Sequence, residues 1–313
     1  MAWNIFVCGS MAYDRIMDFP GRFADHIMPD KIHMLSVSFT VNDMIERPGG
    51  TAGNIAYALA LLGEKPTILA TIGHDYQRYF SWLAQHGISN EGIKVIDDQF
   101  TACAHITTDL ANNQITSFNP GAMKRTSDYD LARARPEESV MVIGAGNVDD
   151  MTAYRDAAHS RGIDFIFDPS QSLPIWPPEE LARCLEGARV LIGNDYELEM
   201  IMNRTGLSKS QLLDRTGAVI TTKGDQGSDV ATRDGEVHVP AVALPEPPVD
   251  PTGAGDAYRG GLIKGLVSGD DLVESARLGA VCASFAVQSQ GTQTYTFDER
   301  QLQARYAETF SGG

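Results

Sequence analysis

The chain has 313 residues, of which 43% are hydrophobic and 21% are charged, a composition typical of a soluble globular protein. Its formal net charge is −16, with 41 Asp and Glu residues against 25 Lys and Arg. Nucleic acid and anionic membranes are therefore excluded as main partners, because both need a basic surface.

The sequence carries no signal for export and no membrane segment. Its start, MAWNIFVCGS, lacks the basic region and long apolar core of a signal peptide, and no run reaches the roughly 18 apolar residues of a membrane span. The four cysteines lie far apart without metal-ligand spacing, so we expect them to be reduced and buried. We expect a cytoplasmic protein in which residues 1–313 form a single domain.

Short apolar runs alternate with helical patterns along most of the chain. The runs predict strands at residues 4–8, 67–72, 140–143, 165–167, 190–192 and 219–222, and the patterns predict helices at residues 52–62, 152–160, 197–204 and 209–215. Strands that alternate with helices form a mostly parallel sheet with helices on both faces. The expected fold class is α/β, with a three-layer α/β/α arrangement.

Polar residues and glycines directly follow five of the predicted strands. Parallel sheets place ligands at the carboxyl ends of their strands. We therefore expect the following positions to converge on one rim: Gly9 and Ser10, residues 144–146, residues 168–170, Asn194, and Thr222.

Two stretches, residues 14–47 and 102–118, alternate in polarity without a long helix. They predict a small antiparallel sheet apart from the main one, and we expect residues 11–48 and 100–122 to form a lid. Exposed edge strands invite pairing with another chain. Apolar lid residues predict a homodimer through the lids: Val37, Phe39 and Val41.

The segment GGTAGN, residues 49–54, is the first that contains candidate binding residues. Paired glycines at the start of an apolar helix offer backbone amides to a ligand. Asn54 can both donate and accept hydrogen bonds, which suits the vicinal hydroxyls of a sugar. The alternative is a tight turn into a helix.

Two further segments follow predicted strands. Asn194 and Glu197 share a helix face, and a carboxylate there suits the water shell of Mg²⁺; a capping box is the alternative. The segment TTKGDQG, residues 221–227, suits the phosphates and ribose of a nucleotide; an ordinary loop is the alternative.

The segment DPTGAGD, residues 250–256, is the most informative. Gly253, Ala254 and Gly255 present amides at a helix N-terminus, which attracts anions. Asp256 suits a general base that removes a proton from an attacking hydroxyl. The alternative is an Asp that caps the helix.

These segments resemble the two signature patterns of the ribokinase-like (PfkB) carbohydrate and nucleoside kinases, in residues 49–73 and 250–261. NDYE and TTKGDQG resemble the family's N-x-x-E motif and nucleotide loop. The resemblance implies a ribokinase-like fold, ATP and Mg²⁺. ATP would contact Asn194, Thr222, Gly224, Gly227, Gly253 and Gly255, while Glu197 and Asn194 would hold Mg²⁺ through water. A K⁺ site at Asp250 and Thr252 is also implied; a loop-stabilising Asp is the alternative.

Within that family the chain is most similar to bacterial adenosine kinases, in stretches such as GSMAYDRIMDFPGRF, ITSFNPGAM and DPSQ. The likeness implies Asp14 and Asn54 on the ribose hydroxyls, with Ser10, Ser38 and Gly50 nearby. It implies Phe118 on the purine, for which a place in the lid core is the alternative. Where a second aromatic is expected, the chain has Ala104 beside His105.

We expect phosphorylation of the 5′-hydroxyl of adenosine to AMP, a purine salvage reaction. The alternative acceptors, in place of adenosine, are ribose, another nucleoside or a related sugar. Sugar phosphates rank lower because the lid segments hold few bases: Arg15, Arg22, Lys31 and Arg47. A nucleoside sensor or a dinucleotide-binding oxidoreductase ranks lowest, because G-x-G-x-x-G is missing and GAGD is intact.

Overall fold

The computed structural model describes residues 3–28, 33–34, 36–111 and 113–310. Within these residues, nine strands form one sheet in the order β13-β12-β11-β10-β9-β8-β1-β4-β5. Neighbours from β11 to β5 run parallel, whereas β12 and β13 run antiparallel to theirs. The bounds are β1 Asn4–Cys8, β4 Thr67–Gly73, β5 Ile93–Ile96, β8 Ser139–Ile143, β9 Asp164–Phe167, β10 Val190–Asn194, β11 Val219–Thr222, β12 Ser228–Thr232 and β13 Gly235–Val239.

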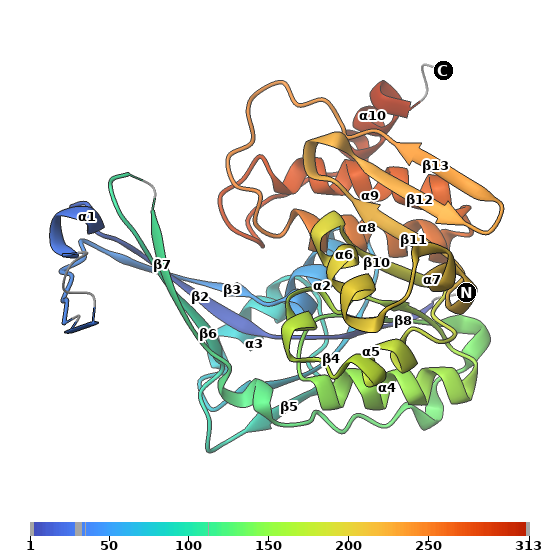
Figure 1. Cartoon of the computed structure of the whole chain (residues 1–313), viewed down its shortest axis with the longest axis horizontal. Coiled ribbons are helices and arrows are strands. Elements are labelled where there is room, and N and C mark those ends of the chain that lie inside the picture. The colour runs from blue at the N-terminus through green and yellow to red at the C-terminus, as the bar shows by residue number, and fades with distance from the viewer. Residues whose placement is uncertain (1–2, 29–32, 35, 112, 311–313) are drawn as a thin grey trace.

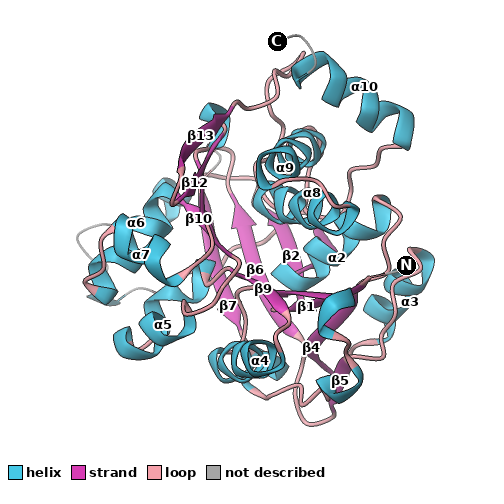
Figure 2. Cartoon of the chain, turned by 90° about the vertical axis from the view of Figure 1, so that its right-hand side faces the viewer, coloured by secondary structure: helices cyan, strands magenta, loops and turns pink. Residues whose placement is uncertain are grey.

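Helices cover both faces of this sheet (Figure 2). Alternate strand residues enter two separate hydrophobic clusters, because successive side chains of a strand point to opposite faces. Val7 and Val142 lie in one cluster, whereas Phe6 and Met141 lie in the other. The first cluster includes residues of α2 Thr51–Leu61, α3 Gln77–Gln85, α8 Ala254–Ser268, α9 Leu272–Ala286 and α10 Glu299–Phe310. The second includes residues of α4 Val148–Arg161, α5 Pro178–Cys184, α6 Asp195–Thr205 and α7 Lys209–Arg215.

The predicted α/β/α layers are confirmed, and the predicted elements agree with the observed bounds to within a few residues. The sequence prediction did not include β5, β12, β13, α3, α5, α9 and α10. All four cysteines are free and buried, as expected. No helix in the described ranges is both long enough and apolar enough to cross a membrane.

A smaller sheet projects from the side of the main layers, with α1 Phe23–His26 at its outer end (Figure 1). Its strands are β2 Ala12–Asp18, β3 Met44–Gly49, β6 Ala102–Thr108 and β7 Gln114–Asn119, in the order β3-β2-β6-β7. The prediction of an antiparallel sheet was wrong for its central pair, because β2 and β6 run parallel.

The expected apolar strand around Val37, Phe39 and Val41 is not formed, since residues 36–40 have no regular structure. Instead, the Phe39 ring packs against the rings of Phe19 and Phe23, which satisfies its apolar surface within the chain. Lys31 lies outside the described residues.

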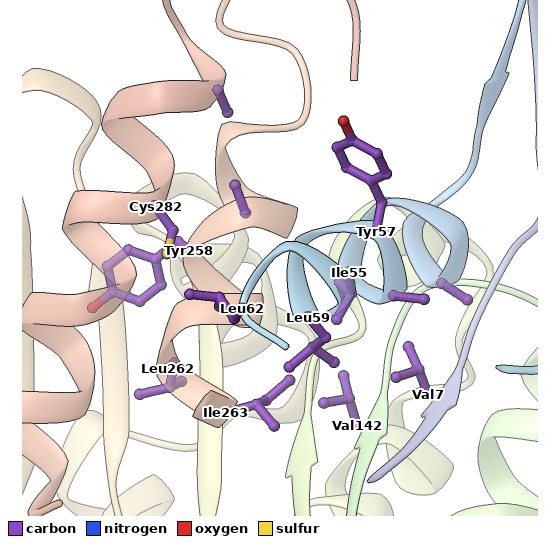
Figure 3. Close-up of a cluster of buried hydrophobic side chains, with 14 of the residues drawn as sticks. Val7, Ile55, Tyr57, Leu59, Leu62, Val142, Tyr258, Leu262, Ile263 and Cys282 are labelled. Carbon is purple, nitrogen blue, oxygen red and sulfur yellow. The ribbon is translucent and has the colours of Figure 1, made fainter. Parts of the chain in front are cut away.

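Close helix packing fixes the position of α8 (Figure 3). A Cβ atom at Gly260 would lie 2.5 Å from the Cβ of Ala58 in α2, and one at Gly261 would lie 2.6 Å from the carbonyl oxygen of Leu278 in α9. Only glycine permits such approach. The helix α8 therefore packs closely against both α2 and α9.

Candidate active site

The rim predicted from the strand ends exists. Ser10 donates its amide to the carbonyl of Ala145 at 2.9 Å, and Asp168 donates its amide to the carbonyl of Ile143 at 2.9 Å. The Ser10 hydroxyl accepts the amide of Thr51 at 3.0 Å, which joins the rim to the start of α2. The carboxyl ends of neighbouring parallel strands are thus tied together at one edge.

The N-terminus of α8 has the geometry of an anion site. Gly253 precedes the helix with a left-handed φ of +79°, which favours glycine. The Ala254 amide bonds the carbonyl of Pro251 at 3.2 Å, whereas no backbone acceptor for the amides of Gly255 and Asp256 is found within the described residues. Unpaired amides at the positive end of the helix dipole can receive an anion.

Asp256 lies in the first turn of α8 and does not cap it, so the capping alternative was wrong. Its Oδ2 accepts the side-chain amide of Asn54 at 2.8 Å. Burial raises the pKa of the Asp256 carboxyl to about 6, although the Arg259 guanidinium and the Asn54 hydrogen bond oppose this rise. The charges of Asp168 and Glu197 add to it. A carboxyl with this pKa is ionised at neutral pH and can take a proton.

Arg259 lies in α8, three residues after Asp256, and was not included among the expected site residues. Its Nη2 donates to Oδ1 of Asp168 at 2.8 Å, and its Nε forms an ion pair with Oδ2. Arg259 is 5% exposed and Asp168 is fully buried. Arg259 lies one helical turn from Asp256, where its positive charge lowers the pKa of Asp256 while the negative charge of Asp168 raises it. The sequence signal for Arg259 was its position as a basic residue three positions after Asp256, in the first turns of the predicted helix.

Cross-strand register places three residues in one row on the smaller sheet. Asp14 in β2 is opposite Ala104 in β6, and Ala104 is opposite Phe118 in β7. Residues in register point to the same face, so the Asp14 carboxylate and the Phe118 ring share a face with only a methyl group between them. Two strand spacings of about 4.8 Å separate them by about 10 Å. Phe118 is 51% exposed, so its ring is free for contact.

The surroundings of Asp14 disfavour the charged form of its carboxyl. Burial raises its pKa to about 6, and the negative charge of Asp250 adds to the rise. A Cβ atom at Gly49 would lie 2.4 Å from its Oδ2, so this close approach needs glycine. Among the described residues no hydrogen-bond donor to Asp14 is found, and an acceptor in this state is suited to a ligand hydroxyl.

The other residues expected to contact the acceptor differ in their surroundings. Gly50 precedes α2 with a φ of +87°, and a Cβ there would lie 2.6 Å from the carbonyl of Ser10. Ser38 is exposed in a segment without regular structure. Asn54 is 5% exposed and bonds Asp256 and Gln293, so its polar atoms are engaged within the chain.

Asn194 and Glu197 form the capping box that was the alternative prediction. The Asn194 side chain accepts the amide of Glu197 at 2.8 Å, and Oε2 of Glu197 accepts the amide of Asn194 at 2.8 Å. Oε1 accepts the hydroxyl of Ser170 at 3.1 Å. The carboxylate keeps lone pairs for water, so the residues fit a hydrated Mg²⁺. Across the described chain, no three His, Cys, Asp or Glu side chains are arranged to hold a metal directly.

Thr222 ends β11, and residues 224–226 form a short 3₁₀ turn after it. Gly224 and Gly227 have φ values of +59° and +89°. A Cβ at Gly227 would lie 2.2 Å from the carbonyl of Val239, whereas one at Gly224 would meet nothing within 4 Å. Gly227 is thus needed for the fold, whereas the space beside Gly224 is open.

Asp250 stabilises its loop, as the alternative reading proposed. Its Oδ1 accepts the amide of Thr252 and its Oδ2 accepts the amide of Gly291, both at 2.9 Å. Burial raises its pKa, but these hydrogen bonds outweigh burial and hold the pKa of Asp250 below its usual range. The carboxylate is therefore charged beside the N-terminus of α8.

The chain is similar to known kinases. Residues 8–299 match the pfkB family of carbohydrate kinases. The nucleoside kinase of Methanothermobacter thermautotrophicus is 30% identical over 302 residues, which are 95% of this chain and 97% of that protein. The structure of Burkholderia thailandensis nucleoside kinase in complex with inosine has a TM-score of 0.86 and 39% identity, covering 98% of each chain. The same protein in complex with ADP-inosine gives a TM-score of 0.84 and 40% identity, covering 98% of this chain and 96% of that one.

Proposed function

Because the chain belongs to the pfkB family of carbohydrate kinases, we propose that it is a nucleoside kinase that transfers the terminal phosphate of ATP to a nucleoside 5′-hydroxyl. Its similarity to nucleoside kinases over nearly the whole chain supports this acceptor class. We propose adenosine as the acceptor, with inosine as a second purine nucleoside, since a related kinase binds it.

The observation that carries the proposal is the row of Asp14, Ala104 and Phe118. A nucleoside has a polyhydroxyl ring and a flat base, so it needs acceptors at one end and an aromatic surface at the other. Asp14 would accept the ribose hydroxyls, and the Phe118 ring would stack on the purine. Stacking of a base on an aromatic side chain contributes about 1–3 kcal/mol. The small side chain of Ala104 leaves room for the base between them.

The chemistry follows from the start of α8. Asp256 would take the proton of the 5′-hydroxyl, because its carboxylate is ionised above about pH 6. The amides of Gly253 and Gly255 would face the transferred phosphate, where the helix dipole offsets its charge. The Ala254 amide, expected beside them, is instead bonded to the carbonyl of Pro251.

ATP would lie along the rim, with its phosphates towards Asn194 and the turn between Gly224 and Gly227. A hydrated Mg²⁺ held by Glu197 would neutralise phosphate charge. A K⁺ near Asp250 and Thr252 would add positive field.

We further propose that the smaller sheet is a lid, built from residues 11–48 and 100–122 of the single domain. Closure over the acceptor would exclude water and limit hydrolysis of ATP. Its edge strands β3 and β7 pair on one side only in the described chain. Ile45 and Ile115 on these strands are 45% and 41% exposed, which favours a homodimer through the lids. Light scattering that shows a monomer at micromolar concentration would contradict the dimer.

An acceptor panel tests the function. ADP release would be measured with adenosine, inosine, a pyrimidine nucleoside and ribose at equal concentration. We expect the highest kcat/KM with a purine nucleoside. Strong activity with ribose and none with nucleosides would replace the proposal with the ribokinase alternative.

A further inference from the structure

We propose that Trp82, Gln293 and Asn54 are positioning residues that fix the orientation of the base Asp256. They form a continuous series of hydrogen bonds, called here the amide chain, that starts at α3 and ends on the catalytic carboxylate. The proposal rests on the proposed function, because it takes Asp256 as the general base.

Three short contacts build the amide chain. Nε1 of Trp82 donates to Oε1 of Gln293 at 2.8 Å. Nε2 of Gln293 donates to Oδ1 of Asn54 at 2.9 Å. Nδ2 of Asn54 donates to Oδ2 of Asp256 at 2.8 Å. Gln293 is 3% exposed and Asn54 is 5% exposed, so water does not compete strongly for these bonds.

The direction of every bond in the amide chain is dictated by its first member. An indole N–H can only donate. Gln293 must therefore turn its oxygen towards Trp82 and its amino group towards Asn54. Asn54 must in turn present its oxygen to Gln293 and its amino group to Asp256. The carboxylate accordingly faces a donor and never an acceptor.

Tyr79 enforces the same direction from a second side. Its hydroxyl donates to the carbonyl of Gly49 at 2.7 Å, so it can only accept from Nε2 of Gln293 at 3.1 Å. A reversed Gln293 would place two acceptors against each other here as well. The carbonyl of Gly49 ends β3, so the amide chain is anchored where the smaller sheet meets the main layers.

One consequence is that the two carboxylate oxygens of Asp256 have different roles. Oδ2 is held by Asn54, which leaves Oδ1 for the substrate hydroxyl. A second consequence concerns the proton affinity of the carboxylate. The Asn54 donor lowers the pKa of Asp256, as Arg259 does, against burial and the charges of Asp168 and Glu197, which raise it. Loss of the donor should therefore make the base more easily protonated.

The variants Gln293→Glu and Gln293→Met test the amide chain. A glutamate can only accept, so it would take the Asn54 amino group and turn the Asn54 oxygen towards Asp256. We expect Gln293→Glu to lower kcat at pH 7 at least about tenfold and to move the acidic limb of the kcat profile upward by about one pH unit. Gln293→Met offers no donor and no acceptor, so we expect a smaller shift in the same direction.

Gln85→Glu is the matched control. Gln85 is exposed and lines the same hollow of about 470 Å³ as Trp82 and Gln293, and its side chain takes no part in the amide chain. The variant adds the same charge nearby, and we expect a wild-type acidic limb. An equal shift in Gln85→Glu would show that charge alone is responsible and would overturn the proposal.

The profiles are measured between pH 5 and 9 with the acceptor that gives the highest rate, whether nucleoside or sugar, at saturating ATP. Urea unfolding shows whether each variant is folded. If Gln293→Glu does not fold, the acidic limb of Gln293→Met is the test of the amide chain. An unchanged acidic limb in a folded Gln293 variant refutes the amide chain. The proposed function fails separately, when the best acceptor is not a nucleoside or when Asp256→Asn retains turnover.

Discussion

Replacing Asp256 by asparagine should abolish catalysis and stabilise the protein at the same time. Asparagine has nearly the same shape and can still accept the side-chain amide of Asn54, but it cannot remove a proton. We expect kcat to fall at least about 100-fold, with the affinity for ATP little changed.

The stability gain follows from the pKa of Asp256. The folded value is about 6 and the ordinary value is 3.8, so the native state prefers the protonated form. The favourable contribution of the carboxyl is present below pH 3.8 and is lost as the pH rises through 6. At pH 8 the buried charge costs roughly 3 kcal/mol, from about 1.36 kcal/mol per pKa unit. Asp256→Asn removes this cost, and the gain should fall to roughly half at pH 5.

Urea unfolding at pH 8 and pH 5 measures this difference, and ADP release measures turnover. Asp234→Asn is the control, because Asp234 is exposed and distant from α8 in the sequence; we expect no change in its free energy of unfolding. A destabilised Asp256→Asn at pH 8, or a gain independent of pH, would refute the reasoning on burial. Near-normal turnover would remove Asp256 from the role of base.

Three further predictions address the acceptor, the buried pair and the nucleotide. Phe118→Ala should raise KM for adenosine by about 5- to 150-fold but leave kcat similar, and initial-rate kinetics showing an unchanged KM would place the ring outside the acceptor site. Arg259→Met should lower the free energy of unfolding by about 3–5 kcal/mol at pH 8, because Asp168 becomes an unpaired buried charge; urea unfolding would contradict this with a loss below about 1 kcal/mol. Glu197→Gln should weaken Mg·ATP binding about tenfold by calorimetry without lowering Tm, because glutamine can still accept the amide of Asn194; unchanged affinity would exclude a metal role.

The main sheet was predictable because its signals are local. The strand β11 and the helix α7 agree with the prediction at both ends, since apolar periodicity and the flanking residues mark them. The helix α4 begins earlier than predicted because Asn147 caps it, accepting the amides of Asp149 and Asp150. That cap was readable in the sequence. The pairing of β2 with β6 was not, because parallel and antiparallel strands share a period of two residues.

The site was predictable only where its residues are neighbours in sequence. The glycine turn and the base at residues 253–256 come from one segment, and the structure keeps them at one helix terminus. Asp168 was expected on the rim, but its pairing with Arg259 spans 91 positions. Gln293 lies in a segment without regular structure and has no periodic signal. Such contacts depend on how the elements pack, which composition and spacing do not specify.

The charges of the site also bear on the acceptor. Asp14 lies on the smaller sheet, Asp250 precedes α8 and Asp256 lies in its first turn, and the pKa of Asp14 is raised partly by Asp250. Arg47 is the base in the same row as Asp14, and its Nη1 is engaged with the carbonyl of Gln290. An acceptor that already carried a phosphate would meet these three carboxylates, against which the described row places one base, Arg47. An uncharged polyhydroxyl would instead supply a donor to the carboxylate of Asp14, for which no hydrogen-bond donor is found in the described part of the chain. The electrostatics therefore favour a neutral nucleoside or sugar over a sugar phosphate, and the exposed ring of Phe118 favours the nucleoside.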